Sequence, residues 1–252
     1  PTPPQIYEAA VKSLHDGETF YTYQLGIPPL RDALAGNFAG LYVRDFSPDE
    51  IFITCGGMQA IQLAIQLPLG PGDEAIILSP AWPNFAGGAL VQNEVIRYVA
   101  LDHSADGWTL DLDRLFAAVT DKTKVLVINS PANPSGWTAT QDELRAILEF
   151  ARQKGLWIIA DEIYVRFYYD DGPGAVAPSF QTIREPEDRI LFAQTVSKNW
   201  AMTGWRMGWL QGPPALAQIV ENHIQYNTSG VAPFMQRAGI AAIEQAGDFA
   251  KG

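Results

Sequence analysis

Short apolar runs alternate with longer segments of helical periodicity along most of the chain. The apolar runs predict strands at Ile51–Thr54, Ala75–Ser79, Val95–Val99, Lys124–Asn129, Leu156–Ala160, Ile190–Gln194 and Gly208–Gln211. The segments of helical periodicity predict helices at Gln5–Asp16, Gln59–Gln66, Leu112–Ala118, Gln141–Lys154 and Pro214–Ile224. Strands that alternate with helices are typical of α/β proteins, so we expect a three-layer αβα fold around a mainly parallel sheet. A loop is expected over residues 170–178, which contain proline and glycine.

Polar and glycine-containing motifs follow directly after five of the predicted strands. Open parallel sheets bind ligands at the edge formed by the carboxyl ends of their strands. We therefore expect a ligand site built from these motifs, which are Cys55–Met58, Ser79–Trp82, Asn129–Gly136, Asp161–Tyr164 and Thr195–Gly208.

The charge and composition exclude several classes of function. The chain has 252 residues, 47% hydrophobic content and a net charge of −11, and a negative surface repels nucleic acid and anionic membranes. No apolar stretch is long enough to span a bilayer and no signal peptide is recognisable, although the sequence begins at Pro1 without a methionine. We expect a cytoplasmic protein that binds neither nucleic acid nor membrane.

Cysteine and histidine are too sparse for a disulfide framework or a metal cluster. The one cysteine, Cys55, is expected to be a small buried residue rather than a nucleophile, and the three histidines are scattered. No metal site is predicted.

Lys198 lies eight residues before Arg206 in a segment rich in tryptophan and glycine. Burial lowers the pKa of a lysine because the charged amine loses hydration, and the neutral amine is the form that condenses with a carbonyl. Arg206 offers a planar fork of donors suited to a phosphate, and the hydroxyls of Thr195 and Ser197 can assist it. An amine beside a phosphate site suggests pyridoxal phosphate, although a lysine that extends from a strand end into solvent would explain this segment equally well by itself.

Taken together, these motifs closely resemble those of the class I and II aminotransferases of the pyridoxal-phosphate superfamily, over nearly the whole chain. The resemblance implies pyridoxal 5′-phosphate as cofactor and transfer of an amino group between an L-amino acid and a 2-oxo acid. It also implies that Lys198, in Ser-Lys-x-x-Ala-Met-Thr-Gly-Trp-Arg, forms the Schiff base with the cofactor. Once released by substrate, this amine would move the proton between Cα and the cofactor's C4′.

The resemblance also implies which residues bind the cofactor ring, and these follow other predicted strands. Asp161 would pair with the pyridine nitrogen and keep it protonated, so that the ring can accept electrons. Tyr164 and Asn133 would donate hydrogen bonds to the phenolic oxygen, and Trp82 would stack on the ring. Taken singly, Asp161 could instead be a helix cap and Trp82 a core or interface residue, and Asn133 by itself is better explained as a turn residue.

The resemblance places the phosphate at the start of the helix after the first strand. The backbone amides of Gly57 and Met58 and the helix dipole would bind it, together with Thr195, Ser197 and Arg206.

The segment Phe20–Arg31 matches the family pattern Tyr-x-x-x-x-Gly-[Ile/Leu]-Pro-x-Leu-Arg. Tyr21 stands where the family's tyrosine reaches the phosphate of the neighbouring subunit, which implies a homodimer. Arg31 is expected to cap or pair structurally.

The expected organisation is an N-terminal arm and helix over residues 1–20 and a cofactor-binding large domain over residues 21–252. The family's C-terminal small domain, with the arginine that binds the substrate carboxylate, has no counterpart in this sequence. Arg237 is instead expected to have a surface or dimer role. Either the sequence is part of a longer protein or the substrate site is incomplete.

Two alternatives to an aminotransferase remain open. A C–S lyase or decarboxylase of the same fold could use Lys198, Asp161 and Arg206, because the bond broken at Cα depends on how the substrate is oriented. A truncated, noncatalytic regulatory module could retain the fold and the cofactor.

Overall fold

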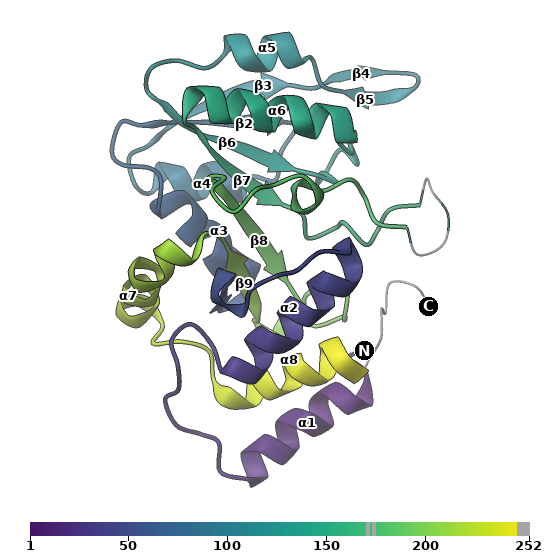
Figure 1. Cartoon of the computed structure of the whole chain (residues 1–252), viewed down its shortest axis with the longest axis vertical. Coiled ribbons are helices and arrows are strands. Elements are labelled where there is room, and N and C mark those ends of the chain that lie inside the picture. Colours follow the sequence, from purple (N-terminus) through teal and green to yellow (C-terminus); the bar gives the residue numbers. More distant parts are fainter. Residues whose placement is uncertain (170–171, 173–174, 246–252) are drawn as a thin grey trace. The chain divides into compact units, whose positions relative to one another are not determined.

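A computed structural model describes residues 1–169, 172 and 175–245. Within them, seven strands form one sheet in the order β1-β9-β8-β7-β6-β2-β3 (Figure 1). The ladders that join β2 to β3, β2 to β6 and β6 to β7 are parallel, whereas β1 and β9 are antiparallel. The expected mainly parallel sheet is confirmed. Its strands are β1 (Ile51–Thr54), β2 (Glu74–Ser79), β3 (Val95–Ala100), β6 (Thr123–Asn129), β7 (Trp157–Asp161), β8 (Ile190–Thr195) and β9 (Gly208–Gln211).

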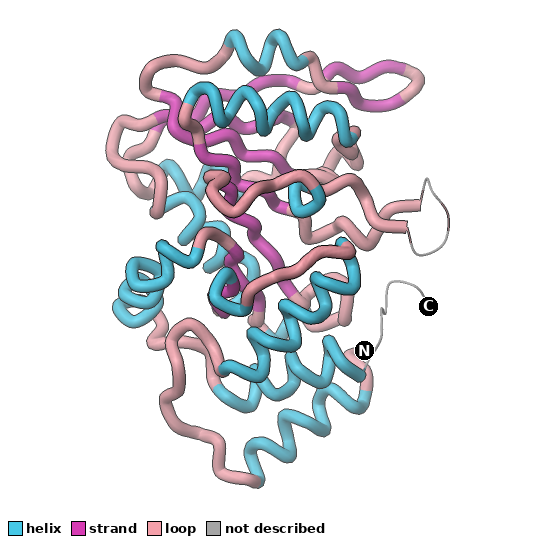
Figure 2. The backbone as a smooth tube through the Cα atoms, in the orientation of Figure 1, coloured by secondary structure: helices cyan, strands magenta, loops and turns pink. Residues whose placement is uncertain are grey.

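Helices occupy most of the connections between the strands (Figure 2). All seven predicted strands are present with ends within one residue of the prediction, because each apolar run is bounded by polar or turn-forming residues. The helices are α1 (Pro4–His15), α2 (Pro28–Tyr42), α3 (Gly56–Gln66), α4 (Asn84–Leu90), α5 (Leu112–Ala117), α6 (Gln141–Lys154), α7 (Ala217–Asn227) and α8 (Pro233–Gln245).

Several elements were not predicted from the sequence. These are α2, α4 and the small hairpin of β4 (Asp102–Ser104) and β5 (Gly107–Thr109), and a short 3-10 turn precedes α7 where one continuous helix was expected. Two glycines in α4 lower its helix propensity, but the helix buries Phe85 and Ala89, each 1% exposed. Four positions of the loop predicted over residues 170–178 lie outside the described residues.

The described chain forms two compact units, residues 1–60 with 193–245, and residues 61–192. In the first unit, α2 packs its buried face with β1, β9 and α8 around one apolar core, and α1 packs against α8. Residues 1–20 thus pack within the first unit, and their division from the rest as a separate arm stays a prediction.

Helix α6 contributes its buried face to the apolar core of the second unit. Its apolar stripe packs onto β6 and β7, and full burial of each leucine or isoleucine side chain in it stabilises the fold by roughly 1.5–3 kcal/mol. A capping box starts the helix, because Thr140 Oγ1 accepts from the Glu143 amide while Glu143 Oε2 accepts from the Thr140 amide. Gly155, with φ +67°, ends the helix. The stripe consists of Leu144, Ile147, Leu148 and Ala151.

Glu94, just before β3, gives the second unit a pH-dependent stability. It is 4% exposed, and neither carboxylate oxygen has a hydrogen-bond partner among the described residues. Burial, assisted by the nearby charge of Asp73, raises its pKa from 4.5 to about 7. The folded protein therefore binds a proton at the Glu94 carboxyl more tightly than the unfolded chain does. The free energy of unfolding decreases as the pH rises from 4.5 through 7, because the carboxyl must then ionise in a buried position.

We expect Glu94→Gln to remove this dependence. At pH 8 the variant should unfold with a free energy about 1 kcal/mol or more above that of the wild type, and at pH 4.5 this advantage should disappear. Urea unfolding at both pH values measures the difference, and Glu187→Gln, at an exposed position, is the control. An equal effect of Glu94→Gln at both pH values would contradict the assignment.

Candidate active site

In the first unit, the turn from β1 into α3 packs closely against the side chains of Arg206 and Thr195. Gly56 has φ +78°, and a Cβ there would lie 2.8 Å from Nη2 of Arg206. A Cβ on Gly57 would lie 3.3 Å from Cβ of Thr195. Arg206 and Thr195 therefore lie against the first turn of α3, where unpaired backbone amides and the helix dipole favour an anion.

A hydroxyl network continues from this turn. Thr195, 4% exposed at the end of β8, donates from Oγ1 to Ser197 Oγ at 2.8 Å or to the Met207 carbonyl at 3.0 Å. The same Oγ1 accepts from the Ser197 amide at 3.1 Å. The guanidinium of Arg206 donates to the Thr203 carbonyl at 2.8 Å. These contacts fix two hydroxyls and one guanidinium beside the start of α3.

Lys198 follows Ser197 on the same loop and is half-buried. Trp200 and Trp209 nearby in the sequence are only 3% and 2% exposed, and they belong to the apolar core of the first unit. Ala201 and Arg206 both have left-handed backbones, with φ of 52° and 50°. Non-glycine residues in this conformation cost free energy and cluster at functional sites, so the loop that carries Lys198 is held in shape by its surroundings.

In the second unit, Asp161 and Asn129 are paired at the carboxyl ends of β7 and β6. Asp161 is 1% exposed, and its Oδ1 accepts from the Ile163 amide at 3.3 Å. Asn129 donates from Nδ2 to the Asp161 carbonyl at 3.0 Å and accepts at Oδ1 from the Asn133 amide at 2.7 Å. The backbone of Asp161 and the loop of Asn133 are therefore neighbours.

The other predicted ring-binding residues of this unit are half-buried. Tyr164 lies edge-on to Phe167, with ring centroids 6.1 Å apart. Trp82, after β2, lies edge-on to Phe85 at 5.6 Å. Both rings are supported on one side while part of their surface stays accessible.

Glu162, beside Asp161, is 2% exposed and forms hydrogen bonds with the segment at Ser179 and Phe180. Its carboxyl oxygens accept from Ser179 Oγ at 2.5 Å and from the Phe180 amide at 3.0 Å. Burial raises its pKa to about 7, against the opposing effect of these two hydrogen bonds. The end of β7 is thus tied to the segment before β8.

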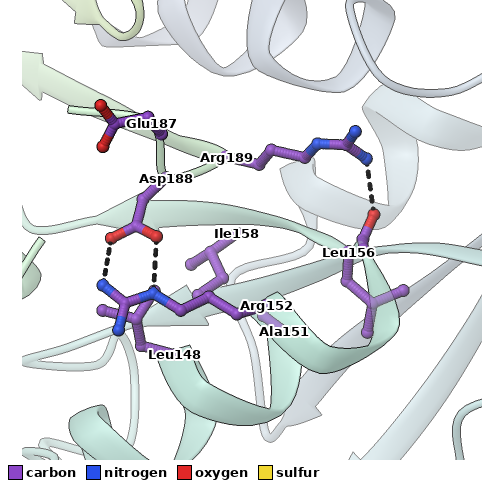
Figure 3. Close-up of a pocket in the computed structure, with 9 residues that line it drawn as sticks. Leu148, Ala151, Arg152, Leu156, Ile158, Glu187, Asp188 and Arg189 are labelled. Atoms are coloured by element: carbon purple, nitrogen blue, oxygen red, sulfur yellow. Dashed lines mark hydrogen bonds and ion pairs between the residues drawn. The ribbon is translucent and has the colours of Figure 1, made fainter. Parts of the chain in front are cut away.

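The sequence-predicted site residues do not line the cavity shown in Figure 3. This cavity of about 310 Å³ lies at the C-terminal end of α6, where β7 begins. At its rim, Arg152 donates to both oxygens of Asp188, at 2.7 and 2.6 Å. Burial opposes ionisation of Asp188, but hydrogen bonds from Arg152 and the Glu185 amide outweigh it and lower the pKa. The pair links α6 to the segment before β8.

Among the described residues, no three histidine, cysteine or acidic side chains are grouped as metal ligands. None of the described helices is long and apolar enough to cross a membrane.

Comparison with known proteins identifies the family. The sequence profile of the family Aminotransferase class I and II matches residues 1–251. The chain belongs to this family. The aspartate/prephenate aminotransferase of Thermus thermophilus is 34% identical in an alignment that covers 96% of this chain and 61% of that protein. The aspartate aminotransferase of Thermotoga maritima is 32% identical, over 97% of this chain and 63% of that protein.

Solved structures show the same fold. The aspartate aminotransferase structure from Rhizobium meliloti matches with a TM-score of 0.90 and 33% identity, covering 99% of this chain and 62% of that one. The Thermotoga maritima aspartate aminotransferase matches with a TM-score of 0.90 and 32% identity, over 97% of this chain and 64% of that one. This aminotransferase-family chain thus spans about three fifths of the length of its relatives.

Members of the class I and II aminotransferase family use pyridoxal phosphate, and the turn from β1 into α3 in the first unit is where this chain is predicted to bind its phosphate. The predicted phosphate residues Gly57, Thr195, Ser197 and Arg206 lie together there, and Met58 is in the same turn of α3. Tyr21 is 86% exposed, so its ring is not buried within this chain.

The structural pairing predicted for Arg31 is present, whereas the surface or dimer role expected of Arg237 stays a prediction. Arg31 donates to the carbonyls of Pro48 and Ile51 and to Asp49. Arg237 forms an ion pair with Glu18, with Nη2 and Oε1 2.7 Å apart, and its hydrogen bonds lower the pKa of Glu18 to about 2.

Sequence reasoning missed the contacts of Asn129, Glu162 and Gly208. Asn129 carried one signal, an asparagine as the last residue of a strand and four positions before Asn133. The partners of Glu162 and the crowding around Gly208 depend on distant segments and left no local pattern.

Proposed function

We propose that this chain forms the cofactor-binding part of a pyridoxal-phosphate-dependent aminotransferase that moves an amino group between an L-amino acid and a 2-oxo acid. The observation that carries the proposal is the cradle at the start of α3, where Gly56 and Gly57 leave room and Arg206, Thr195 and Ser197 supply donors beside Lys198. The relatives named above favour aspartate as one substrate.

The proposed roles follow from the position and chemistry of each side chain. Lys198 binds the cofactor's aldehyde carbon and, once freed, carries the substrate proton. The bound cofactor supplies an electron sink for the substrate's Cα. Asp161, buried and acidic, holds the pyridine nitrogen in its protonated form. Tyr164 and Asn133 donate to the phenolic oxygen, and Trp82 supports the ring face.

Half-reaction spectra test the proposal in the protein that contains residues 1–252. Addition of L-aspartate should shift the absorption of the bound cofactor to that of pyridoxamine phosphate, and addition of a 2-oxo acid should restore it. Release of carbon dioxide, or of sulfide from a thiol-containing amino acid, would instead identify a decarboxylase or a lyase. Cofactor binding without any spectral conversion would contradict the aminotransferase and favour a regulatory module.

We further propose a cytoplasmic homodimer in which Tyr21 completes the phosphate site of the neighbouring subunit. Tyr21, Phe20 and Tyr23 are 86%, 63% and 65% exposed, an unusual concentration of aromatic surface. Tyr21 also lines a cavity of about 440 Å³ formed with residues 228–234 of the same unit. The single cysteine is compatible with a reducing compartment.

Removal of one hydroxyl tests the role of Tyr21. We expect Tyr21→Phe to bind pyridoxal phosphate roughly fivefold to tenfold more weakly, because a hydrogen bond to a charged group is lost. Fluorescence titration measures the affinity, and light scattering measures the mass of the particle. Tyr226→Phe, at an exposed tyrosine of α7, is the matched control. A monomeric wild type with the same affinity as Tyr21→Phe would refute the dimer.

A further inference from the structure

The side chain of Asn129 connects two segments to which the proposed function assigns the cofactor ring. Its Nδ2 donates to the carbonyls of Asp161, at 3.0 Å, and Pro131, at 3.3 Å. Its Oδ1 accepts from the amide of Asn133 at 2.7 Å. One half-buried amide group therefore makes three hydrogen bonds, two within the loop after β6 and one to the end of β7.

Only a side chain with both a donor and an acceptor can make this set of contacts. An aspartate would keep the acceptor for Asn133 but would turn a charged oxygen toward two carbonyls, and an alanine would make none of the bonds. The backbone holds Asn129 in place, because its Cα is the direct ladder partner of the Asp161 Cα and the Ser130 amide donates to the Asp161 carbonyl at 3.1 Å. The Asn129 side chain thus connects the paired ends of β6 and β7 to the loop that follows β6.

The hydrogen bonds of the Asn129 side chain matter more for the position of the loop after β6 than for the end of β7. The carbonyl of Asp161 has a second donor in the Ser130 amide, and Asp161 itself is 1% exposed in the core. The Asn133 amide is held by Asn129 Oδ1, and the Asn133 side chain starts from that anchored backbone. Loss of the Asn129 amide should therefore move Asn133 while Asp161 stays in place.

We propose that Asn129 is a positioning residue for pyridoxal phosphate, because it fixes the position of Asn133 relative to Asp161. The proposal rests on the proposed function, in which Asn133 donates to the phenolic oxygen and Asp161 binds the pyridine nitrogen on the same ring. Both contacts to one rigid ring require that the Asn133 donor and the Asp161 acceptor be held within about 0.5 Å of their positions. Asn129 supplies this constraint without touching the cofactor.

Asn129→Ala tests the proposal by two readouts that do not depend on turnover. We expect the dissociation constant for pyridoxal phosphate to rise roughly tenfold, as for other residues that orient ligand-binding groups. A hydrogen bond from Asn133 stabilises the ionised phenolic oxygen and lowers the pH at which the lysine-bound cofactor loses its proton. In Asn129→Ala, this spectroscopic transition should move up by about 0.5–1 pH unit.

A double-mutant cycle separates positioning from a general loss of structure. If Asn129 acts through Asn133, Asn129→Ala should change the spectroscopic pH transition little in an Asn133→Ala background, although each single variant raises it. Asn129→Asp is the second variant, because it retains the acceptor for Asn133 and should have a smaller effect on the dissociation constant. Asn227→Asp, at an exposed position of α7, controls for the added charge.

The outcomes distinguish this proposal from the function on which it rests. Wild-type protein that binds no pyridoxal phosphate would refute both. Wild-type binding, together with a folded Asn129→Ala whose affinity and pH transition are unchanged, would overturn the positioning role alone, and so would an Asn129→Asp whose loss of affinity equals that of Asn129→Ala. Additive shifts in the double-mutant cycle would also overturn it, because Asn129 would then act independently of Asn133.

Discussion

Replacement of Lys198 by alanine is expected to abolish conversion of the cofactor by an amino acid, with a loss of roughly 10⁴-fold or more in the rate of the half-reaction. No other lysine lies on the loop between Thr195 and Arg206. The cradle of Arg206, Thr195 and Ser197 is intact in the variant, so the phosphate group should still bind. Absorption spectra should therefore show a bound aldehyde that does not respond to amino acid.

Chemical trapping identifies the lysine directly. Borohydride reduction of the wild type, followed by peptide mass spectrometry, should place the pyridoxyl group on Lys198, and the label should be absent from Lys198→Ala. Lys122→Ala, in an exposed loop of the second unit, should react like the wild type. A label on another lysine of the wild type, or an active Lys198→Ala protein, would contradict the assignment.

The parallel sheet and the candidate site motifs could be predicted from the sequence because their signals are local. A buried strand requires a short apolar run, and a ligand site at its carboxyl end requires particular residues within a few positions of that run. Gly56-Gly57, Asp161 and Lys198 all satisfy this condition. Their motifs were sufficient to identify the family, which the match over residues 1–251 confirms.

The remaining features depend on residues far apart in the sequence. Thr2 donates to the carbonyl of Ala201 and accepts from the indole of Trp205, contacts that span about 200 positions. The ion pair of Arg237 with Glu18 spans 219. Helix α4 was not predicted either, because its stability comes from buried Phe85 rather than from helix propensity. Such contacts exist only once the fold has brought distant segments together.

Gly208 is a position where a single added methyl group should strongly destabilise the fold. A Cβ there would lie 2.6 Å from the carbonyl oxygen of Gln194 and 2.7 Å from the backbone carbon of Gly56 and nitrogen of Gly57. All three atoms belong to backbone, which cannot rotate away as a flexible side chain could. Gly208→Ala should therefore destabilise the protein by about 3 kcal/mol.

The same substitution should weaken cofactor binding, because the methyl group pushes on the turn that starts α3. Gly204→Ala is the matched control, since a Cβ at Gly204 would meet nothing within 4 Å, and its free energy of unfolding should stay within about 0.5 kcal/mol of the wild type. Urea unfolding and titration with pyridoxal phosphate measure both effects. Equal stability of the two variants would show that the turn tolerates a side chain at Gly208. A folded Gly208→Ala protein with reduced affinity would instead connect the close approach of β9 to the proposed phosphate site.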